Sequence, residues 1–237
     1  MCGRYTIIDL SRFTDLFPWI RQPETPAPPR YNVCPSQEVP VVVNSAPPKI
    51  DFAQWGLVPS WGSASVRPMI NARAETLASK RTFKDALRKR RCLLPADGFY
   101  EWKTTPTGER CPVYFRLKSG KPFAFAALWE ASRVGGELAK TCTIITTNSN
   151  QLVEPIHDRM PVILIEEDYR RWLEAAEKEP DDLLSMLKPF PAEAMEAVEV
   201  SRAVNSPKNE GPQCIEPEKG SGFGVQGSGE EKQPRLF

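Results

Sequence analysis

The chain has 237 residues, a formal net charge of +1 and a hydrophobic content of 41%, and without a composition break before its C-terminal tail it fits one large domain. No stretch reaches the ~18 to 20 apolar residues of a membrane-spanning helix, and the N-terminus lacks a signal peptide, so we expect an intracellular, cytoplasmic protein. The near-neutral charge excludes a globally basic nucleic-acid-binding domain but leaves a local basic groove open.

The chain contains six cysteines and one histidine. No two cysteines form a C-x-x-C pair, and a zinc site needs more closely spaced Cys and His ligands than these. The sequence therefore predicts reduced, mostly buried thiols and no metal centre.

Cys2 follows the initiator Met, and a small residue at this position is the usual condition for removal of that Met. A mature chain that begins at Cys2 carries an α-amine and a thiol on adjacent carbons. The α-amine has a pKa of ~7.7–8.0, so a usable fraction is neutral at pH 7 and can attack an aldehyde. The thiol can then close a five-membered thiazolidine ring, helped by its proximity. A cysteine at position 2 also occurs in many proteins in which it has no functional role.

The first half of the chain predicts short elements. Residues 2–8 form a strand pattern, and Asp9 can cap a helix over residues 9–17. The proline-rich stretch 18–35 is not expected to form a regular element. Residues 39–44 and 50–55 predict a β-hairpin, and residues 55–61 and 71–76 are loop-like.

A strongly basic helix is predicted over residues 82–90, with Thr82 and Asp85 in the register of a capping box. Its charges are typical of a solvated helix face, and a phosphate-binding patch is the alternative. The second half is rich in strand patterns and adds two further helices. Expected strands cover residues 92–95, 99–103, 113–117, 123–128, 141–147, 160–164 and 197–200, and expected helices cover 166–178 and 180–187.

Antiparallel strands joined by short turns, with helices around them, indicate an α+β fold with a mixed, mainly antiparallel, barrel-like sheet and peripheral helices. We assign this domain to residues 2–205. From residue 206 to residue 237 the composition becomes rich in Gly, Pro, Ser, Glu and Lys, which predicts a disordered tail.

Three polar residues are candidates for chemistry. His157 is the only histidine and lies in a predicted loop before a strand. Glu101 lies among aromatic residues, and burial beside their rings would raise the pKa of its carboxyl and suit it to proton transfer near neutral pH. Asn71 offers an amide donor and acceptor. Each also has a structural interpretation: a core histidine, an exposed strand position and a loop amide.

Six motifs occur in order across about 160 residues, and together they resemble the SOS response-associated peptidase (SRAP) family, whose members crosslink to abasic sites in DNA. The motifs are MCGRY (1–5), YNVCP (31–35), WGLVPSW (55–61), NARAET (71–76), PADGFYEW (95–102) and IHDRMP (156–161). The resemblance covers residues 2–205. Cys34 stands where the family usually has Ala, so a second thiol is expected near the site.

The resemblance implies a covalent thiazolidine link between Cys2 and an abasic site, with lyase-class Schiff-base chemistry. It also implies removal of Met1, either by a thiol autopeptidase activity of this chain or by an aminopeptidase. We expect no metal or cofactor, a monomer, and a place at replication forks on the nucleoid. The catalytic residues carry over to Cys2, Asn71, Glu101 and His157. The residues expected to bind single-stranded DNA are Arg4, Trp61, Arg73 and Thr146.

The last five residues resemble peptides that bacterial replication proteins insert into the sliding clamp. A disordered tether with apolar anchors suits that binding mode. The contacts would be made by Gln233, Leu236 and Phe237.

Two other functions remain open from the sequence. An N-terminal-nucleophile amidohydrolase would also use Cys2, with the α-amine as base and the thiol as nucleophile. A non-covalent reader of damaged or modified DNA would not need the Cys2 thiol at all.

Overall fold

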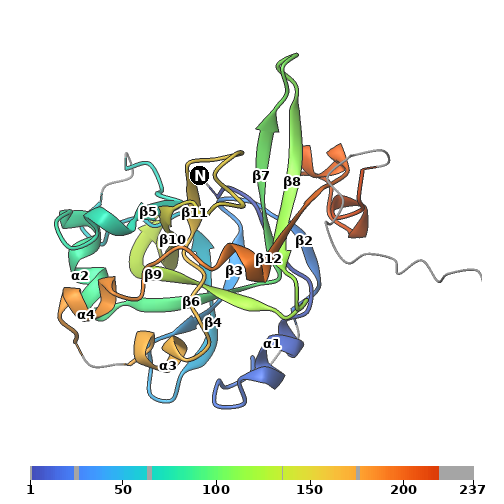
Figure 1. The fold of residues 1–237 in the computed structure, drawn as a ribbon. Helices are drawn as coiled ribbons and strands as arrows, with labels where there is room; N and C mark the ends of the chain where they lie inside the picture. The colour runs from blue at the N-terminus through green and yellow to red at the C-terminus, as the bar shows by residue number, and fades with distance from the viewer. Residues whose placement is uncertain (1, 24–26, 63–65, 135, 175–176, 219–237) are drawn as a thin grey trace, which may run out of the picture.

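The computed structural model describes residues 2–23, 27–62, 66–134, 136–174 and 177–218. Two sheets and a few short peripheral helices make up the fold (Figure 1). The predicted α+β class with a barrel-like sheet is confirmed. No helix among the described residues is both long and apolar enough to cross a membrane.

One sheet closes into a barrel because β10 pairs with both β9 and β4. The five strands of the ring are β3 (Glu38–Val43), β4 (Lys49–Trp55), β6 (Arg91–Ala96), β9 (Phe123–Val134) and β10 (Glu137–Asn148). Two short strands, β5 (Asn71–Arg73) and β11 (Arg159–Pro161), add to β10 outside the ring. The two pairings of β10 therefore close the barrel.

The second sheet is antiparallel throughout and has five strands. In order across the sheet they are β12 (Met195–Glu199), β8 (Arg110–Leu117), β7 (Gly98–Thr104), β1 (Tyr5–Ile7) and β2 (Arg30–Val33). The β7–β8 hairpin extends beyond the barrel (Figure 1). Gly98 in β7 is required by packing, because a Cβ there would lie 2.4 Å from the ring of Tyr114.

Tyr5 joins the two sheets. Its ring lies 5.3 Å from the ring of Trp55 on β4 and 5.8 Å from that of Phe125 on β9, both with edge-on geometry. Such aromatic pairs contribute about 0.5–1.5 kcal/mol beyond their buried area. Since Tyr5 is fully buried, the start of the chain is held firmly between the sheet and the barrel.

Helices lie at the periphery: α1 (Leu10–Leu16), α2 (Arg81–Lys89), α3 (Asp168–Trp172) and α4 (Pro180–Leu184). The Asp9 cap is confirmed, since its carboxylate accepts a 3.0 Å hydrogen bond from the Arg12 amide. The expected cap at Thr82 is wrong: α2 starts one residue earlier, after Lys80, with no side-chain cap. The helix expected over 166–178 ends at Trp172.

The basic run at the end of α2 has structural partners. Arg91 is fully buried and its guanidinium donates to the carbonyls of Leu87, Arg88 and Trp172. Arg88 forms ion pairs with Glu177 and Glu179. For these two residues the structure does not leave the charge free for phosphate.

Two stretches predicted to lack regular structure contain strands. Residues 18–35 include β2, which pairs with β1, and residues 71–76 begin with β5, which pairs in parallel with β10. Both strands are very short, so their own sequence carries little signal. Their partners lie far away along the chain.

The fold continues past the boundary expected at residue 205. Ser201 and Glu218 make backbone hydrogen bonds with Glu216 and Glu199, and Cys214 is fully buried. Glu210 accepts hydrogen bonds from the backbone amides of Tyr31 and Asn32. Residues 206–218 are thus part of the folded body. The 219–237 segment, with the expected clamp-binding Gln233, Leu236 and Phe237, lies outside the described residues.

Candidate active site

Cys2 precedes β1, which lies between β2 and β7 in the antiparallel sheet. Its side chain is fully buried, and its Sγ lies 3.8 Å from the carbonyl oxygen of Arg4. Burial raises the pKa of the Cys2 thiol, and the Glu101 carboxylate raises it further. The thiol is therefore protonated at neutral pH and needs a base before it can act as a nucleophile.

Asn71 is the first residue of β5, opposite Ile144 on β10. Its Nδ2 donates a 2.8 Å hydrogen bond to the carbonyl oxygen of Cys2. Its Oδ1 is buried and has no hydrogen-bond partner among the described residues. An unpaired buried acceptor is costly, so this oxygen is suited to accept a hydrogen bond from a bound group.

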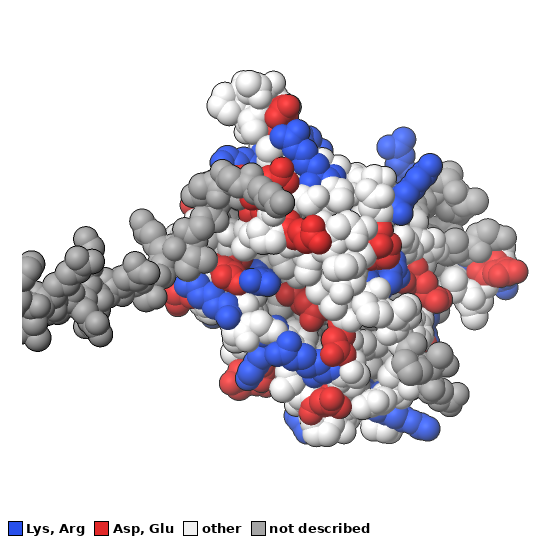
Figure 2. Space-filling model, turned by 90° about the vertical axis from the view of Figure 1, so that its right-hand side faces the viewer, with Lys and Arg blue, Asp and Glu red and all other residues white. Residues whose placement is uncertain are grey.

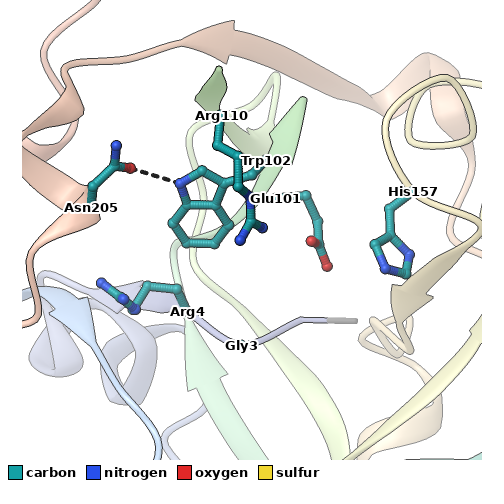
Figure 3. A pocket seen from close by; sticks show the side chains of 7 residues that line it. All are labelled: Gly3, Arg4, Glu101, Trp102, Arg110, His157 and Asn205. Carbon is teal, nitrogen blue, oxygen red and sulfur yellow. Dashed lines mark hydrogen bonds between the residues drawn. The ribbon is translucent and has the colours of Figure 1, made fainter. Parts of the chain in front are cut away.

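Glu101 lies on β7 and is only 4% exposed. Burial raises the pKa of its carboxyl, and the nearby His157 acts in the opposite direction. Figure 3 shows the Glu101 carboxylate and the His157 ring side by side in the pocket. A carboxyl with a raised pKa can donate a proton closer to neutral pH than an exposed glutamate.

His157 lies in the turn before β11. Its Nδ1 lies 3.0 Å from the backbone nitrogen of Arg159 and 2.9 Å from a carboxylate oxygen of Asp158. The two contacts require different protonation of Nδ1. The Asp158 side chain is 83% exposed, so water screens its charge. An imidazole accepts through one ring nitrogen and donates through the other when it is neutral, and it donates through both when it is protonated.

A pocket of about 490 Å³ has Glu101 and His157 in its lining (Figure 3). Its lining comes from the N-terminal segment, the β7–β8 hairpin, the His157 turn and the C-terminal 3₁₀ turn. The residues are Gly3, Arg4, Glu101, Trp102, Arg110, His157 and Asn205. The described residues contain no group of three or more His, Cys, Asp and Glu side chains placed to bind a metal ion.

An ion pair links two of the motifs near the site. The guanidinium of Arg159 makes paired contacts of 2.6 and 2.9 Å with the carboxylate of Glu75, and it also donates to the carbonyl oxygen of Thr146. The hydrogen bond from Arg159 lowers the pKa of Glu75. This contact ties the turn that carries His157 to the segment that carries Asn71.

The four residues predicted to bind DNA lie in different environments. Arg4 lines the pocket. Trp61 is 54% exposed, with the guanidinium of Arg81 5.0 Å from its ring centroid, and Arg73 is exposed at the end of β5. Thr146 is fully buried in β10, and its Oγ1 has no hydrogen-bond partner among the described residues. Thr146 therefore offers no surface contact in this structure.

Cys34 is not part of the pocket lining. Its Sγ donates to the carbonyl oxygen of Asn32 at 3.2 Å, and the residue is 7% exposed. Burial raises the pKa of the thiol. A buried, protonated thiol is a poor nucleophile, so its environment is that of a structural residue.

Sequence reasoning missed several residues that build the site. Arg110, Trp102 and Asn205 line the pocket but were given no functional role. Glu75 and Arg159 lie inside recognised motifs, which was a usable signal for their pairing. Asn205 lies close to the expected end of the domain, and no local pattern marks it.

These features define a protein with a buried cysteine at position 2 beside a polar pocket, and its similarity to known proteins assigns the family. The family model for SOS response associated peptidase (SRAP) matches residues 1–207. The chain belongs to this family.

Curated relatives carry names that describe their activity. Abasic site processing protein YoqW from Bacillus subtilis is 44% identical over 224 residues, which cover 91% of this chain and 99% of the relative. Abasic site processing protein YedK from Escherichia coli is 33% identical, covering 79% and 84% of the two chains. HMCES from Xenopus tropicalis, also named an abasic site processing protein, is 31% identical over 79% of this chain and 65% of the relative.

A solved structure shares the fold. The crystal structure of a protein from Bacteroides thetaiotaomicron superposes with a TM-score of 0.78 at 26% identity, over 92% of this chain and 100% of the other.

Proposed function

We propose that this protein processes abasic sites in single-stranded DNA by forming a covalent thiazolidine link through Cys2, after Met1 has been removed. The observation that carries the proposal is that Glu101 and His157 line one pocket, next to Gly3, and that the preceding residue Cys2 is linked to Asn71. Asn71 donates to the carbonyl of Cys2, Glu101 raises the pKa of the Cys2 thiol, and His157 lowers the pKa of the Glu101 carboxyl. The names of the relatives support the choice of abasic DNA as substrate.

The chemistry begins with the ring-opened aldehyde of the abasic deoxyribose. Protonated His157 gives its proton to the ring oxygen as the sugar opens and takes up the proton that the C1′ hydroxyl loses, a task that suits an imidazole. The neutral Cys2 amine adds to C1′ and forms a carbinolamine. Protonated Glu101 gives its proton to the departing hydroxyl, and water leaves as the C1′–N double bond forms.

The thiol then completes the ring. The Cys2 sulfur attacks C1′, the C–N double bond becomes single, and the thiol proton passes to the Glu101 carboxylate. Glu101 is thereby restored to its protonated state, and the net reaction releases one water. Capture by the thiol also removes the imine, which would otherwise lead to β-elimination and strand cleavage.

Binding of the DNA would rely on a few local contacts. Basic and acidic side chains are interspersed over the face shown in Figure 2, in keeping with the net charge of +1. The aldehyde must leave any base stack before it can react, so single-stranded DNA is the favoured substrate. Exposed Trp61 would support a neighbouring base, an interaction worth about 1–3 kcal/mol.

Intact mass spectrometry of the protein mixed with abasic single-stranded DNA tests the proposal. We expect loss of Met1 and a heat-stable adduct whose mass is the sum of protein and DNA less one water. Cys2→Ala should give no heat-stable adduct, whereas Cys34→Ala should behave as wild type. A stable adduct on a chain that retains Met1 would contradict the chemistry.

The same samples separate the alternatives. A non-covalent reader would bind abasic DNA equally well with Cys2→Ala and give no adduct in any variant. An amidohydrolase would turn over glutamine. Self-removal of Met1 would fail in Cys2→Ala when that variant is made in an extract without aminopeptidase. Clamp binding through Gln233, Leu236 and Phe237 is tested by deleting residues 233–237 and measuring binding to the clamp.

A further inference from the structure

The pocket has two chemically different ends. Figure 3 shows His157 at one end and Asn205 at the other, with Glu101, Arg110 and Trp102 between them. The proposed reaction takes place at the end of the pocket that contains Glu101 and His157. The end with Asn205 contains no group that the proposed reaction uses.

The indole of Trp102 is fixed at this second end. Its Nε1 donates a 2.7 Å hydrogen bond to Oδ1 of Asn205. Asn205 is the last residue of a 3₁₀ turn, Arg202–Asn205, in which the Ala203 amide donates to Oγ of Ser201. Because the Asn205 oxygen is occupied by Trp102, the amide Nδ2 is the group that this side chain has left to offer a ligand as donor.

Two guanidinium groups lie against the same indole. The Cζ atoms of Arg4 and Arg110 are each 5.5 Å from the centroid of the Trp102 ring, within cation–π range. The hydrogen bonds of Arg4 go to neutral oxygens, Oδ1 of Asn32 at 2.6 Å and the carbonyl of Val204 at 2.7 Å.

No carboxylate among the described residues forms an ion pair with either guanidinium. Neither charge is therefore held in an ion pair, and the Arg110 charge lowers the pKa of the Glu101 carboxyl in the same pocket. Guanidinium groups placed in this way are suited to bind an anion with acceptor oxygens, and phosphate is the anion that their planar geometry fits best.

We propose that Arg110, Trp102 and Asn205 form a phosphate subsite, which binds the phosphodiester directly flanking the abasic sugar. The inference rests on the proposed function. Arg110 supplies the charge, Trp102 holds the Arg110 guanidinium in place, and Asn205 positions Trp102 and donates from Nδ2 to a phosphate oxygen.

The arrangement favours phosphate over a base. Two guanidinium groups already lie against the Trp102 ring, so the ring is not presented as a free stacking platform. A sugar and its own phosphate are covalently joined neighbours, so a sugar at Glu101 and His157 brings a phosphate into the same pocket. The subsite would align C1′ without reading the neighbouring base, since phosphate contacts carry no sequence information.

Arg110→Gln tests the subsite through affinity. The ligand is a single-stranded oligonucleotide with a tetrahydrofuran in place of the abasic sugar, which lacks the aldehyde and binds without crosslinking. We expect the Kd to rise about tenfold, the loss of one charge-assisted contact. The slope of log Kd against log salt concentration should fall by about 0.7, the value for one phosphate on a single strand.

A neutral methylphosphonate at the 5′ or the 3′ flanking position of the same oligonucleotide identifies the phosphate. At the bound position it should weaken wild-type binding about as much as Arg110→Gln does. It should add little to the Arg110→Gln loss, because the two changes remove the same contact. A methylphosphonate several nucleotides away should show additive behaviour.

Arg116→Gln is the matched control, because Arg116 lies on the same strand, pairs with Glu196 and does not line the pocket. Asn205→Ala should weaken binding, and Asn205→Asp should weaken it further by placing a negative charge beside the phosphate. Unchanged Kd and salt slope in Arg110→Gln, or additive methylphosphonate effects at both flanking positions, would overturn the subsite.

The wild-type protein with a true abasic oligonucleotide is tested alongside. Absence of its adduct would count against the proposed function, whereas a normal wild-type adduct with unaffected Arg110→Gln binding would count against the subsite alone. The methylphosphonate effect on wild-type protein does not depend on whether any variant folds.

Discussion

The side-chain amide of Asn71 donates a 2.8 Å hydrogen bond to the backbone carbonyl of Cys2. This bond joins a strand of the barrel sheet to the residue that precedes β1, and so it fixes the backbone that carries the reactive amine and thiol. The bond orients the backbone of Cys2, while Oδ1 of Asn71 has no hydrogen-bond partner among the described residues.

Replacing Asn71 should therefore slow crosslinking more than it affects folding. Asn71→Ala and Asn71→Asp both remove the donor, and each should lower the rate of adduct formation by about tenfold or more, the value of one hydrogen bond. Quenched time courses with abasic DNA measure the rate. Asn44→Ala is the control, since Asn44 makes a similar 2.9 Å bond to the carbonyl of Lys89 and does not line the pocket. A normal rate in Asn71→Asp would contradict the role.

Loss of the Glu75–Arg159 ion pair should lower both the stability of the fold and the rate of adduct formation. Glu75→Ala leaves a mostly buried guanidinium without its carboxylate, and we expect a loss of about 2 kcal/mol in the free energy of unfolding. Urea denaturation measures it, and the adduct rate should fall as the His157 turn loosens. Glu75→Gln keeps one acceptor oxygen and should lie between wild type and Glu75→Ala.

Asp97 should make stability depend on pH. Burial raises the pKa of its carboxyl from 3.8 to about 6. Between about pH 4 and pH 6 the folded protein thus holds a proton that the unfolded chain has lost, so stability falls as the pH rises through this window, by up to about 3 kcal/mol.

Asp97→Asn mimics the protonated form and keeps an oxygen that can accept from the Ile8 amide. Relative to wild type, it should become more stable as the pH is raised from 4.5 to 7.5, as measured by urea midpoints. Asp15→Asn, exposed on α1, controls for the substitution itself. Parallel pH curves for wild type and Asp97→Asn would refute the assignment.

The segment 206–218 should be required for folding stability. A chain that ends at residue 205 lacks Glu210 and the carbonyls of Ser206 and Asn209, which accept 3.0 and 2.7 Å hydrogen bonds from the buried Asn32 amide. Leaving that amide unsatisfied costs about 1–3 kcal/mol. Thermal denaturation should show a clearly lower Tm for the chain ending at 205, with little change for one ending at 218.

Local patterns predicted the parts of the fold whose partners are close in sequence. The β3–β4 hairpin and the Asp9 cap were found because alternation and capping act over a few residues. β5 was taken for a loop because it has three residues and depends on β10 for its pairing. The disordered tail was predicted to begin at residue 206, although the fold extends to residue 218. The polar composition of this segment gives no sign that Cys214 and Glu210 contact residues far away along the chain.

For the site, too, the sequence identifies residues that lie in local motifs but does not predict the contacts between distant residues. Cys2, Asn71, Glu101 and His157 lie within recognisable motifs. Glu101 and His157 line one pocket, and Asn71 donates to the carbonyl of Cys2, while the catalytic roles of all four stay predictions. The contact between Arg159 and Glu75 spans 84 residues, and that between Trp102 and Asn205 spans 103. No local spacing rule connects residues so far apart.

Glu210 has one further consequence. β2 is the last strand of its sheet, so its outer amides would be available to a strand from a second molecule. The Glu210 carboxylate accepts from two of them, at Tyr31 and Asn32. A single acidic side chain thus blocks intermolecular strand pairing there and protects the protein from aggregation through that edge.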